Sequence, residues 1–379
     1  MARTSRLFVG LMSGTSIDGV DAVLADMSVD GDARTLARAS LPMPAELRES
    51  LTMLALGKAT GDGLDAASLA AIGLTRLYAQ AVARLLEGRS PEDVVAIGAH
   101  GQTVRHAPAR GYSLQLIDGA LLAELTGRPV VCDFRSGDIA AGGEGAPLVP
   151  AYHRAVFGHP AERRAVVNIG GIANISWLAD AEPVLGFDTG PGNTLLDGWC
   201  ARHTGRPFDE DGAWAASAAP DAALLAALLS DPYFGRPAPK STGRETFHLD
   251  WLAERGGPAG LDGLPPAVVQ ATLLELTARS IADALAPLRP DAVLVCGGGV
   301  ANRALLERLR ALVAPARCES TQSVGIDPQA VEASAFAWLA ARRIDRLPGN
   351  LPSATGARGE RVLGALYDPR PIADSRSRS

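Results

Sequence analysis

Gly186-Phe187-Asp188-Thr189-Gly190-Pro191-Gly192-Asn193 is the segment that most strongly indicates the fold and chemistry of this chain. The apolar residues 183–187 predict a buried strand, and residues 194–202 predict a helix. A strand that delivers a carboxylate to a glycine-rich turn can hold a base beside a bound phosphate. Because like charges repel, Asp188 is predicted to accept a proton or hold a metal ion and not to bind the phosphate itself.

Two further glycine-rich turns follow predicted strands. Residues 13–19, Ser-Gly-Thr-Ser-Ile-Asp-Gly, lie between strands predicted at 7–12 and 20–26, and the sequence contains no P-loop pattern. Gly297-Gly298-Gly299 separates a predicted strand from a predicted helix that starts at Val300. Such glycines allow a ligand to approach the backbone, or they allow tight strand–helix packing. Each turn alone is compatible with a plain hairpin, but together they favour a shared ligand.

The composition limits the possible partners and compartments. The chain has 379 residues, 47% of them hydrophobic, and a net charge of −6 from 36 basic and 42 acidic residues in mixed order. This predicts one or two large domains, and it disfavours nucleic acid as a partner because no basic stripe is present. The four cysteines form no C-x-x-C pair, so we expect reduced thiols and a cytoplasmic protein. Neither a signal peptide nor a membrane span is expected, since no run of 18 apolar residues occurs.

Strands and helices mix along the chain, which predicts an α/β fold. Predicted strands lie within 7–41 and at 94–99, 112–117, 129–132, 164–169, 172–178, 184–187 and 291–296, and predicted helices at 45–57, 64–87, 264–288 and 328–343. The strand pattern of residues 7–41 recurs at 164–188 as a weak repeat of architecture. We therefore expect two similarly built lobes with a ligand cleft between them.

The segment 133–150 changes character, from polar to small and flexible residues. We predict that the chain crosses between domains here and that this segment also faces a ligand. The predicted N-terminal lobe comprises residues 1–135, joined by the C-terminal helix near 328–370. The predicted C-terminal lobe comprises residues 136–327.

The run Gly10-Leu11-Met12-Ser13-Gly14-Thr15-Ser16-Ile17-Asp18-Gly19-Val20-Asp21 resembles the opening signature of anhydro-N-acetylmuramic acid kinases. Ile17 stands where the family is expected to have leucine. Further resemblance appears in the same order over roughly residues 7–345, at 99–103, 143–148, 186–193, 239–245, 297–299 and 325–328. The tail beyond about residue 370 carries none.

The resemblance implies the fold of acetate and sugar kinases, heat-shock-type ATPases and actin, in which two RNase H-like lobes close over nucleotide and sugar. It implies an ATP-dependent enzyme that opens the 1,6-anhydro ring of 1,6-anhydro-N-acetylmuramic acid and phosphorylates O6. The product would be N-acetylmuramic acid 6-phosphate, formed in peptidoglycan recycling and amino-sugar catabolism. ATP and Mg²⁺ are the implied cofactors, and the implied assembly is a homodimer.

The same resemblance makes Asp188 the general base, with capping of the following helix as the alternative. The residues expected to bind the nucleotide are Met12, Ser13, Gly14, Thr15, Ser16, Ile17, Asp18, Gly19, Gly190, Gly192, Asn193, Gly297, Gly298, Gly299 and Asn302. Asp18 or Asp21 is expected to hold Mg²⁺ through water, because Mg²⁺ binds few carboxylates and keeps several waters.

The residues expected to bind the sugar are His100, Gln102, Thr103, Asp133, Arg135, Asp138, Glu144, Lys240 and Glu332. Arg135 is the best candidate for the lactyl carboxylate because its guanidinium can donate two parallel hydrogen bonds. The alternatives are a structural role for His100, an interlobe salt bridge for Arg135, and a solvated turn for Lys240 with Ser241, Thr242 and Arg244.

Three other functions are compatible with this fold. A different sugar or acid kinase would phosphorylate an existing hydroxyl without opening a ring. An actin- or chaperone-like ATPase would bind a protein partner and turn over ATP without sugar. An inactive homologue is disfavoured because Asp188 and the glycine turns are intact.

Overall fold

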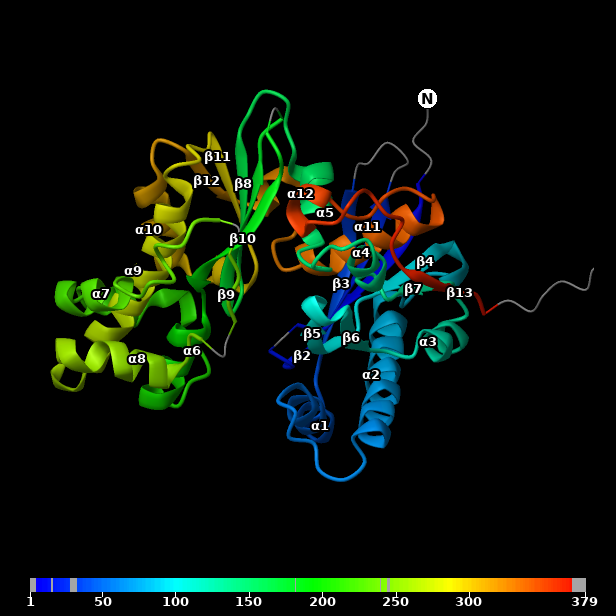
Figure 1. The fold of residues 1–379 in the computed structure, drawn as a ribbon, viewed down its shortest axis with the longest axis horizontal. Coiled ribbons are helices and arrows are strands. Elements are labelled where there is room, and N and C mark those ends of the chain that lie inside the picture. The colour runs from blue at the N-terminus through cyan, green and yellow to red at the C-terminus, as the bar shows by residue number, and fades with distance from the viewer. Residues whose placement is uncertain are drawn as a thin grey trace, which may run out of the picture. The chain divides into compact units, whose positions relative to one another are not determined.

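The computed structural model describes residues 5–14, 16–27, 33–180, 182–238, 240–243 and 246–369 (Figure 1). Its contacts divide the chain into two compact units. The first unit contains the residues up to Tyr152 and those from Glu332 onward, and the second contains His153–Val331. The first unit is therefore built from two separate parts of the chain.

The first unit is built on a six-stranded sheet in the order β13-β7-β4-β1-β2-β3. Its strands are β1 (Leu7–Met12), β2 (Gly19–Met27), β3 (Ala33–Pro42), β4 (Val94–Ala99), β7 (Val130–Cys132) and β13 (Ala365–Tyr367). Strands β1, β2 and β3 form an antiparallel meander, and β4 runs parallel to both β1 and β7. A separate hairpin consists of β5 (Gln102–Ala107) and β6 (Tyr112–Leu116).

The second unit repeats this arrangement in a five-stranded sheet of order β10-β9-β8-β11-β12. Its strands are β8 (Arg164–Ile169), β9 (Ile172–Leu178), β10 (Leu185–Pro191), β11 (Ala292–Cys296) and β12 (Arg317–Ser320). Again the first three strands are antiparallel, and the fourth is parallel to the first and the fifth. Two sheets with this shared order and direction confirm the predicted α/β fold of two RNase H-like lobes.

Helices cover both sheets (Figure 1). The first unit contains α1 (Ala45–Ala55), α2 (Gly63–Leu85), α3 (Gly119–Thr126), α4 (Ser136–Ala140), α11 (Val331–Ile344) and α12 (Pro352–Thr355), and α5 (Val149–Phe157) spans the boundary. The second contains α6 (Thr194–Thr204), α7 (Ala222–Leu229), α8 (Leu249–Gly256), α9 (Pro266–Leu285) and α10 (Arg303–Val313). Within the described ranges, no single helix has the length and apolar composition needed to cross a membrane.

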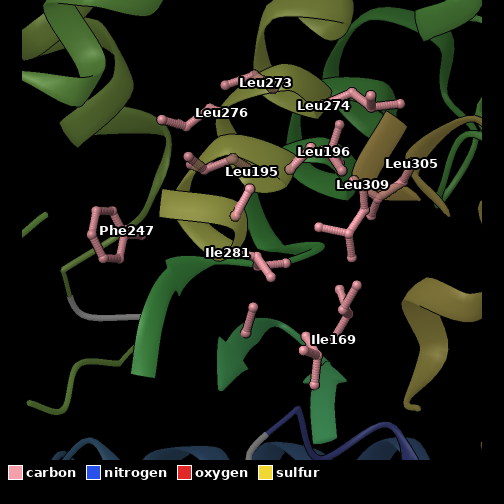
Figure 2. Close-up of a cluster of buried hydrophobic side chains, with 14 of the residues drawn as sticks. Ile169, Leu195, Leu196, Phe247, Leu273, Leu274, Leu276, Ile281, Leu305 and Leu309 are labelled. Carbon is pink, nitrogen blue, oxygen red and sulfur yellow. The ribbon is translucent and has the colours of Figure 1, made fainter. Parts of the chain in front are cut away.

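The core of the second unit packs helices against its sheet (Figure 2). Leucines from α6, α9 and α10 meet Ile169 of β8 and Phe247, and all are buried. Fully burying one such side chain stabilises the fold by about 1.5–3 kcal/mol. This core holds the sheet whose strand β10 carries Asp188, the candidate catalytic residue.

Helix α11 lies directly against the first sheet because two facing strands carry glycine. Gly10 of β1 and Gly98 of β4 are register partners. A side chain at Gly10 would collide with the carbonyl of Ala333, and one at Gly98 with that of Phe336. The sheet can therefore accept the backbone of α11 at close range only with glycine at both positions.

The first unit extends past residue 135, where we predicted its boundary. Asp138 of α4 is fully buried, and its carboxylate accepts hydrogen bonds from Gly145 N at 2.8 Å, Asn350 Nδ2 at 2.7 Å and Thr355 Oγ1 at 2.7 Å. These bonds tie residues 136–152 to the C-terminal segment of the same unit. The chain crosses between units at Tyr152–His153 and Val331–Glu332 instead.

Three local assignments also differ from the sequence predictions. Strand β10 continues to Pro191, so Asp188 lies within the strand and not after it. Gln102 and Thr103 start strand β5, where we predicted no strand. The glycine triplet leads into a short 3-10 turn, and the helix itself begins at Arg303.

Candidate active site

Asp188 is held by a neighbouring loop through its main chain and its side chain. It is half-buried on β10, opposite Asn174 of β9. Its N–H donates to Lys240 O at 2.9 Å, and its Oδ2 accepts a hydrogen bond from Thr242 N at 2.9 Å. A backbone N–H donated to a carboxylate stabilises the ionised form. This arrangement suits a residue that must be charged before it accepts a proton.

Asp188 does not stand at the N-cap position of the following helix. Helix α6 has Asn193 at its N-cap position, without a side-chain capping hydrogen bond. Asp188 forms hydrogen bonds with Lys240, Thr242 and Tyr233.

The turn after Asp188 uses its N–H groups in hydrogen bonds to the β8–β9 turn. Gly192 N donates to Gly171 O at 2.9 Å and Asn193 N to Gly170 O at 2.8 Å. A side chain at Gly192 would collide with the carbonyl of Gly170. These bonds occupy the donors that we predicted for phosphate, so this turn supports the β8–β9 turn instead of binding an anion through those groups.

The β8–β9 turn is a candidate that the sequence prediction missed. Gly170 and Gly171 connect the first two strands of the second sheet, as residues 13–18 do in the first sheet. Both glycines are partly exposed. The repeated strand pattern at 7–41 and 164–188 was the signal that pointed to this equivalence.

The first turn is anchored from inside. Ser13 is buried, and its Oγ donates to Gln102 Oε1 at 2.7 Å. Ile17 is also buried and has a φ of 53°, a left-handed conformation unusual for a branched residue. Ser16 Oγ donates to Asp18 Oδ1 at 2.7 Å. Thr15 lies outside the described residues, while Met12 ends β1 and Gly19 begins β2.

The two predicted metal ligands stand in different settings. Asp18 is exposed in the turn. Asp21 is also exposed, on β2, and accepts a hydrogen bond from Ser40 Oγ. Partial desolvation by the protein around it raises the pKa of its carboxyl group, and that hydrogen bond opposes the shift. In the part of the chain that the structure describes, no group of three or more His, Cys, Asp or Glu side chains is arranged to hold a metal.

The glycine triplet mainly allows close packing. Gly297 has a φ of 83°, and a side chain there would collide with Asn168. A side chain at Gly299 would collide with Ile169. Gly298 differs, because it is exposed and has room for a side chain. Asn302 caps α10 by accepting a hydrogen bond from Leu305 N at 3.0 Å. Gly298 is the most exposed residue of the triplet, while Gly297 is partly exposed and Gly299 is buried.

The buried His100 pairs with the half-buried Arg135 in the first unit. Arg135 Nη2 lies 2.8 Å from His100 Nε2, and its Nη1 donates to Gly145 O at 2.8 Å. Because a guanidinium only donates, His100 must accept at Nε2 and carry its proton on Nδ1. Burial, assisted by Arg135, lowers the pKa of His100 to about 3, so the imidazole is neutral. Burial lowers the pKa of Arg135 to about 10, and Glu332 opposes that shift.

The β5–β6 hairpin carries a second polar network. Gln115 Nε2 donates to Thr103 Oγ1 at 3.1 Å and to Ser113 Oγ at 2.7 Å. His106 Nδ1 lies 3.0 Å from Ser113 Oγ. Burial and then Arg135 lower the pKa of His106, while Glu144 raises it. The sequence prediction missed His106 because it placed no strand at 102–107. It missed Ser113 and Gln115 because it assigned no binding role to the strand predicted at 112–117.

The remaining predicted sugar ligands separate into exposed and occupied groups. Asp133, Glu144 and Glu332 are exposed. The buried carboxylate of Asp138 is engaged within its own unit, as described above, which is the physical reason to exclude it.

Lys240 is also occupied, since its Nζ donates to Tyr233 O and Phe234 O, each at 3.1 Å. Burial lowers the pKa of Lys240. Arg244, with Pro239 and Glu245 of the same motif, lies outside the described residues.

Each unit contains a cavity that is not lined by Asp188. One of about 380 Å³ in the first unit is lined by Met43, Ala45, Arg48, Glu49, Thr52 and Met53. One of about 420 Å³ in the second has Phe187, Thr189, Phe234 and Lys240 among its lining residues. Since residues 187 and 189 flank Asp188 on the strand, this second cavity lies behind the carboxylate.

Comparison with known proteins gives consistent matches. Residues 6–369 match the family model described as anhydro-N-acetylmuramic acid kinase. A protein of that name from Bordetella avium is 55% identical over 364 residues, covering 96% of each chain. Another from Pseudomonas paraeruginosa is 53% identical over 365 residues, covering 95% of this chain and 98% of the relative.

The similar solved structures are more distant. A ROK family glucokinase from Streptomyces griseus, in complex with glucose and AMPPNP, matches with a TM-score of 0.40 and 17% identity, covering 88% of this chain and 99% of its own. Component A of the (R)-2-hydroxyglutaryl-CoA dehydratase of Acidaminococcus fermentans matches with a TM-score of 0.47 and 12% identity, covering 89% and 99%.

Proposed function

This chain belongs to the anhydro-N-acetylmuramic acid kinase family, and we propose that it couples opening of the 1,6-anhydro ring to ATP-dependent phosphorylation at O6. Its substrate is 1,6-anhydro-N-acetylmuramic acid, and its products are N-acetylmuramic acid 6-phosphate and ADP. The reaction serves peptidoglycan recycling and amino-sugar catabolism. The observation that carries the mechanism is the hydrogen bond from Thr242 N to Asp188 Oδ2, which favours an ionised, fixed carboxylate.

Asp188 accepts a proton from a water molecule whose oxygen forms a bond to the anomeric carbon. The bond between that carbon and the bridging O6 breaks, and O6 takes its electron pair. O6 then attacks the γ-phosphorus, and the bond from phosphorus to the ADP oxygen breaks. Ring cleavage thus generates the nucleophile, so one base is enough for both steps of the reaction. A well-placed base contributes about 10²–10⁴-fold to such a rate.

The phosphates are assigned to the turns that connect the first two strands of each sheet. These are residues 13–19 and Gly170–Gly171, whose glycines let an anion approach the backbone. Because Gly170 N donates to Ile172 O at 3.2 Å, Gly171 is the residue of the second turn that we assign to the anion. Gly298 is the open position of the glycine triplet, and we assign it to the nucleotide.

Asp18 suits Mg²⁺ because this ion accepts a single carboxylate when waters complete its shell. When bound, Mg²⁺ would neutralise charge on the transferred phosphoryl group. Asp21 is the second candidate. Its carboxylate accepts a hydrogen bond from Ser40, as that of Asp18 does from Ser16.

The sugar is assigned to the polar surface around Arg135 in the first unit. Arg135 is the cation for the lactyl carboxylate, and the neutral His100 fixes its guanidinium. Gln102, Thr103 and the hairpin side chains His106 and Gln115 supply hydrogen bonds to the hydroxyl and N-acetyl groups. We also propose that the protein is cytoplasmic and forms a homodimer. Light scattering, which gives the molar mass in solution, would test the dimer.

The decisive experiment measures ADP release with ATP and Mg²⁺ in three parallel reactions: with the anhydro sugar, with free N-acetylmuramic acid, and without sugar. Strong stimulation by the anhydro sugar alone, with a 6-phosphate product, is expected. Stimulation by the free sugar alone would instead indicate an ordinary sugar kinase. Steady ADP release without sugar would indicate a partner-driven ATPase.

A further inference from the structure

Strand β10 is interrupted at the candidate base. Its pairing with β9 shifts register between Asp188 and Gly190, so Thr189 is an extra residue in a bulge. A bulge leaves ladder groups without their regular partners and redirects a side chain. Its geometry must therefore be maintained by contacts from outside the sheet.

Tyr233 supplies one of these contacts. Its Oη donates to the main-chain carbonyl of Asp188 at 2.9 Å. Burial, followed by the charge of Asp188, raises the pKa of Tyr233, so the hydroxyl remains protonated and able to donate. Phe234 supplies a second contact, because its ring edge occupies the space where a Gly190 side chain would stand, 2.7 Å from that position.

Lys240 joins these two aromatic residues to the base. Its ammonium donates to the carbonyls of both Tyr233 and Phe234, and it lies 4.8 Å from the centre of the Tyr233 ring. Its own carbonyl accepts from Asp188 N, and two residues later Thr242 N donates to Asp188 Oδ2. Tyr233, Lys240 and Thr242 therefore contact the carbonyl, the amide and the carboxylate of Asp188, respectively.

We infer that Tyr233, Phe234 and Lys240 form a positioning clip that fixes the direction of the Asp188 carboxylate. The inference rests on the proposed function, and it assigns these residues to the orientation of the base and not to substrate binding. Small displacements of a catalytic group cost up to about 100-fold in rate. The clip therefore acts on kcat, while the affinities for ATP and sugar stay the same.

The test is Tyr233→Phe, which removes one hydroxyl and keeps the ring. We expect kcat to fall about 5- to 30-fold, with KM for ATP and for the anhydro sugar within about twofold. Tyr367→Phe is the matched control, since Tyr367 is 40% exposed in the first unit. Tyr367→Phe should leave kcat and both KM values unchanged. Lys240→Met is a second variant that removes the donated bonds and should reproduce the fall in kcat.

A double-mutant cycle separates positioning from a general loss of structure. In an Asp188→Asn background, Tyr233→Phe should cause less than a twofold further loss, because the base that it positions is already absent. An equal fall in both backgrounds would overturn the inference, as would an unchanged kcat in both Tyr233→Phe and Lys240→Met. A wild-type protein without sugar-stimulated ADP release would overturn the proposed function and the clip together. An active wild type with unaffected variants would overturn the clip alone.

Discussion

At the scale of single residues, the proposed role of Asp188 as the base predicts that this residue determines the rate. Asp188→Asn keeps the size of the side chain and an oxygen for the Thr242 N–H. It removes the capacity to accept a proton, so kcat should fall by about 10²–10⁴-fold with little change in either KM. Steady-state kinetics measure both constants. A variant that retained more than about a tenth of the wild-type kcat would show that Asp188 is not the base.

Arg135 should determine affinity for the sugar. Arg135→Lys keeps the charge but loses the two-pronged donor that contacts His100 and Gly145. Hydrogen bonds to charged groups contribute about 1.5–3 kcal/mol, so KM for the anhydro sugar should rise about 10- to 100-fold while KM for ATP stays constant. The analogue without a lactyl group is the control substrate, and its KM should change much less. Equal effects on both sugars would contradict the assignment to the carboxylate.

Two buried histidines should make stability depend on pH. Burial lowers the pKa of both His100 and His153 to about 3. The unfolded chain binds protons first, below about pH 6.5, so the folded state is fully stable above that value and loses stability from pH 6.5 towards 3. Each histidine contributes about 1.4 kcal/mol per pH unit in this window.

Urea unfolding at pH 7.5 and 5.5 tests this dependence. The variant His153→Gln should have a lower free energy of unfolding than the wild type at pH 7.5. Between pH 7.5 and 5.5, that free energy should fall less in the variant than in the wild type. If the variant and the wild type showed the same pH dependence, His153 would not contribute to it.

At the scale of elements, the contact between α11 and the first sheet depends on missing side chains. Gly10→Ala places a methyl group against the carbonyl of Ala333, so stability should fall by about 1–3 kcal/mol or more. Gly63→Ala in the first turn of α2 is the control, because nothing lies within 4 Å of the added atom. It should be neutral or slightly stabilising. Denaturant midpoints of the two variants give the comparison, and equal midpoints would contradict the close contact.

Periodicity and turn composition were sufficient to predict most elements. The meander at 7–41, helices α2 and α9, and strands β4, β8, β9 and β11 lie where apolar patterns placed them. The pattern failed for β12 (Arg317–Ser320) and β13 (Ala365–Tyr367), which are short and take part in sheets only through long-range pairing. Segment 133–150 appeared flexible because its small and polar residues gave no sign of the distant partners of Asp138.

The candidate site was predictable only where local sequence carried the signal. Asp188 and the turn at 13–19 could be named because a strand led directly into each of them. The clip around Asp188 and the hairpin network around His106 could not, because their hydrogen bonds join residues far apart in the sequence. The glycines 192, 297 and 299 were predicted to bind nucleotide, but they are required for backbone packing, which a sequence alone cannot distinguish from ligand binding.

At the scale of the whole molecule, the first unit needs the C-terminal part of the chain. Ending the chain at Val331 removes α11 and exposes the sheet face that carries Gly10 and Gly98. We expect loss of soluble protein, because an uncovered apolar face promotes aggregation. Ending the chain at Pro369 keeps every described residue and is the control. Soluble yield and resistance to protease measure the outcome, and a well-folded product of the shorter chain would contradict this requirement.

The two-part construction of the first unit also matters during translation. A ribosome completes the strands β1 to β7 first, then makes the whole of His153–Val331 before α11 emerges. At about 5–20 residues per second this interval lasts roughly 10–40 s, during which the early sheet lacks its covering helix. The second unit has its segments in one continuous stretch and can fold meanwhile. Nascent chains of this protein are therefore expected to depend on chaperones for the half that is made first, although it is the last to be finished.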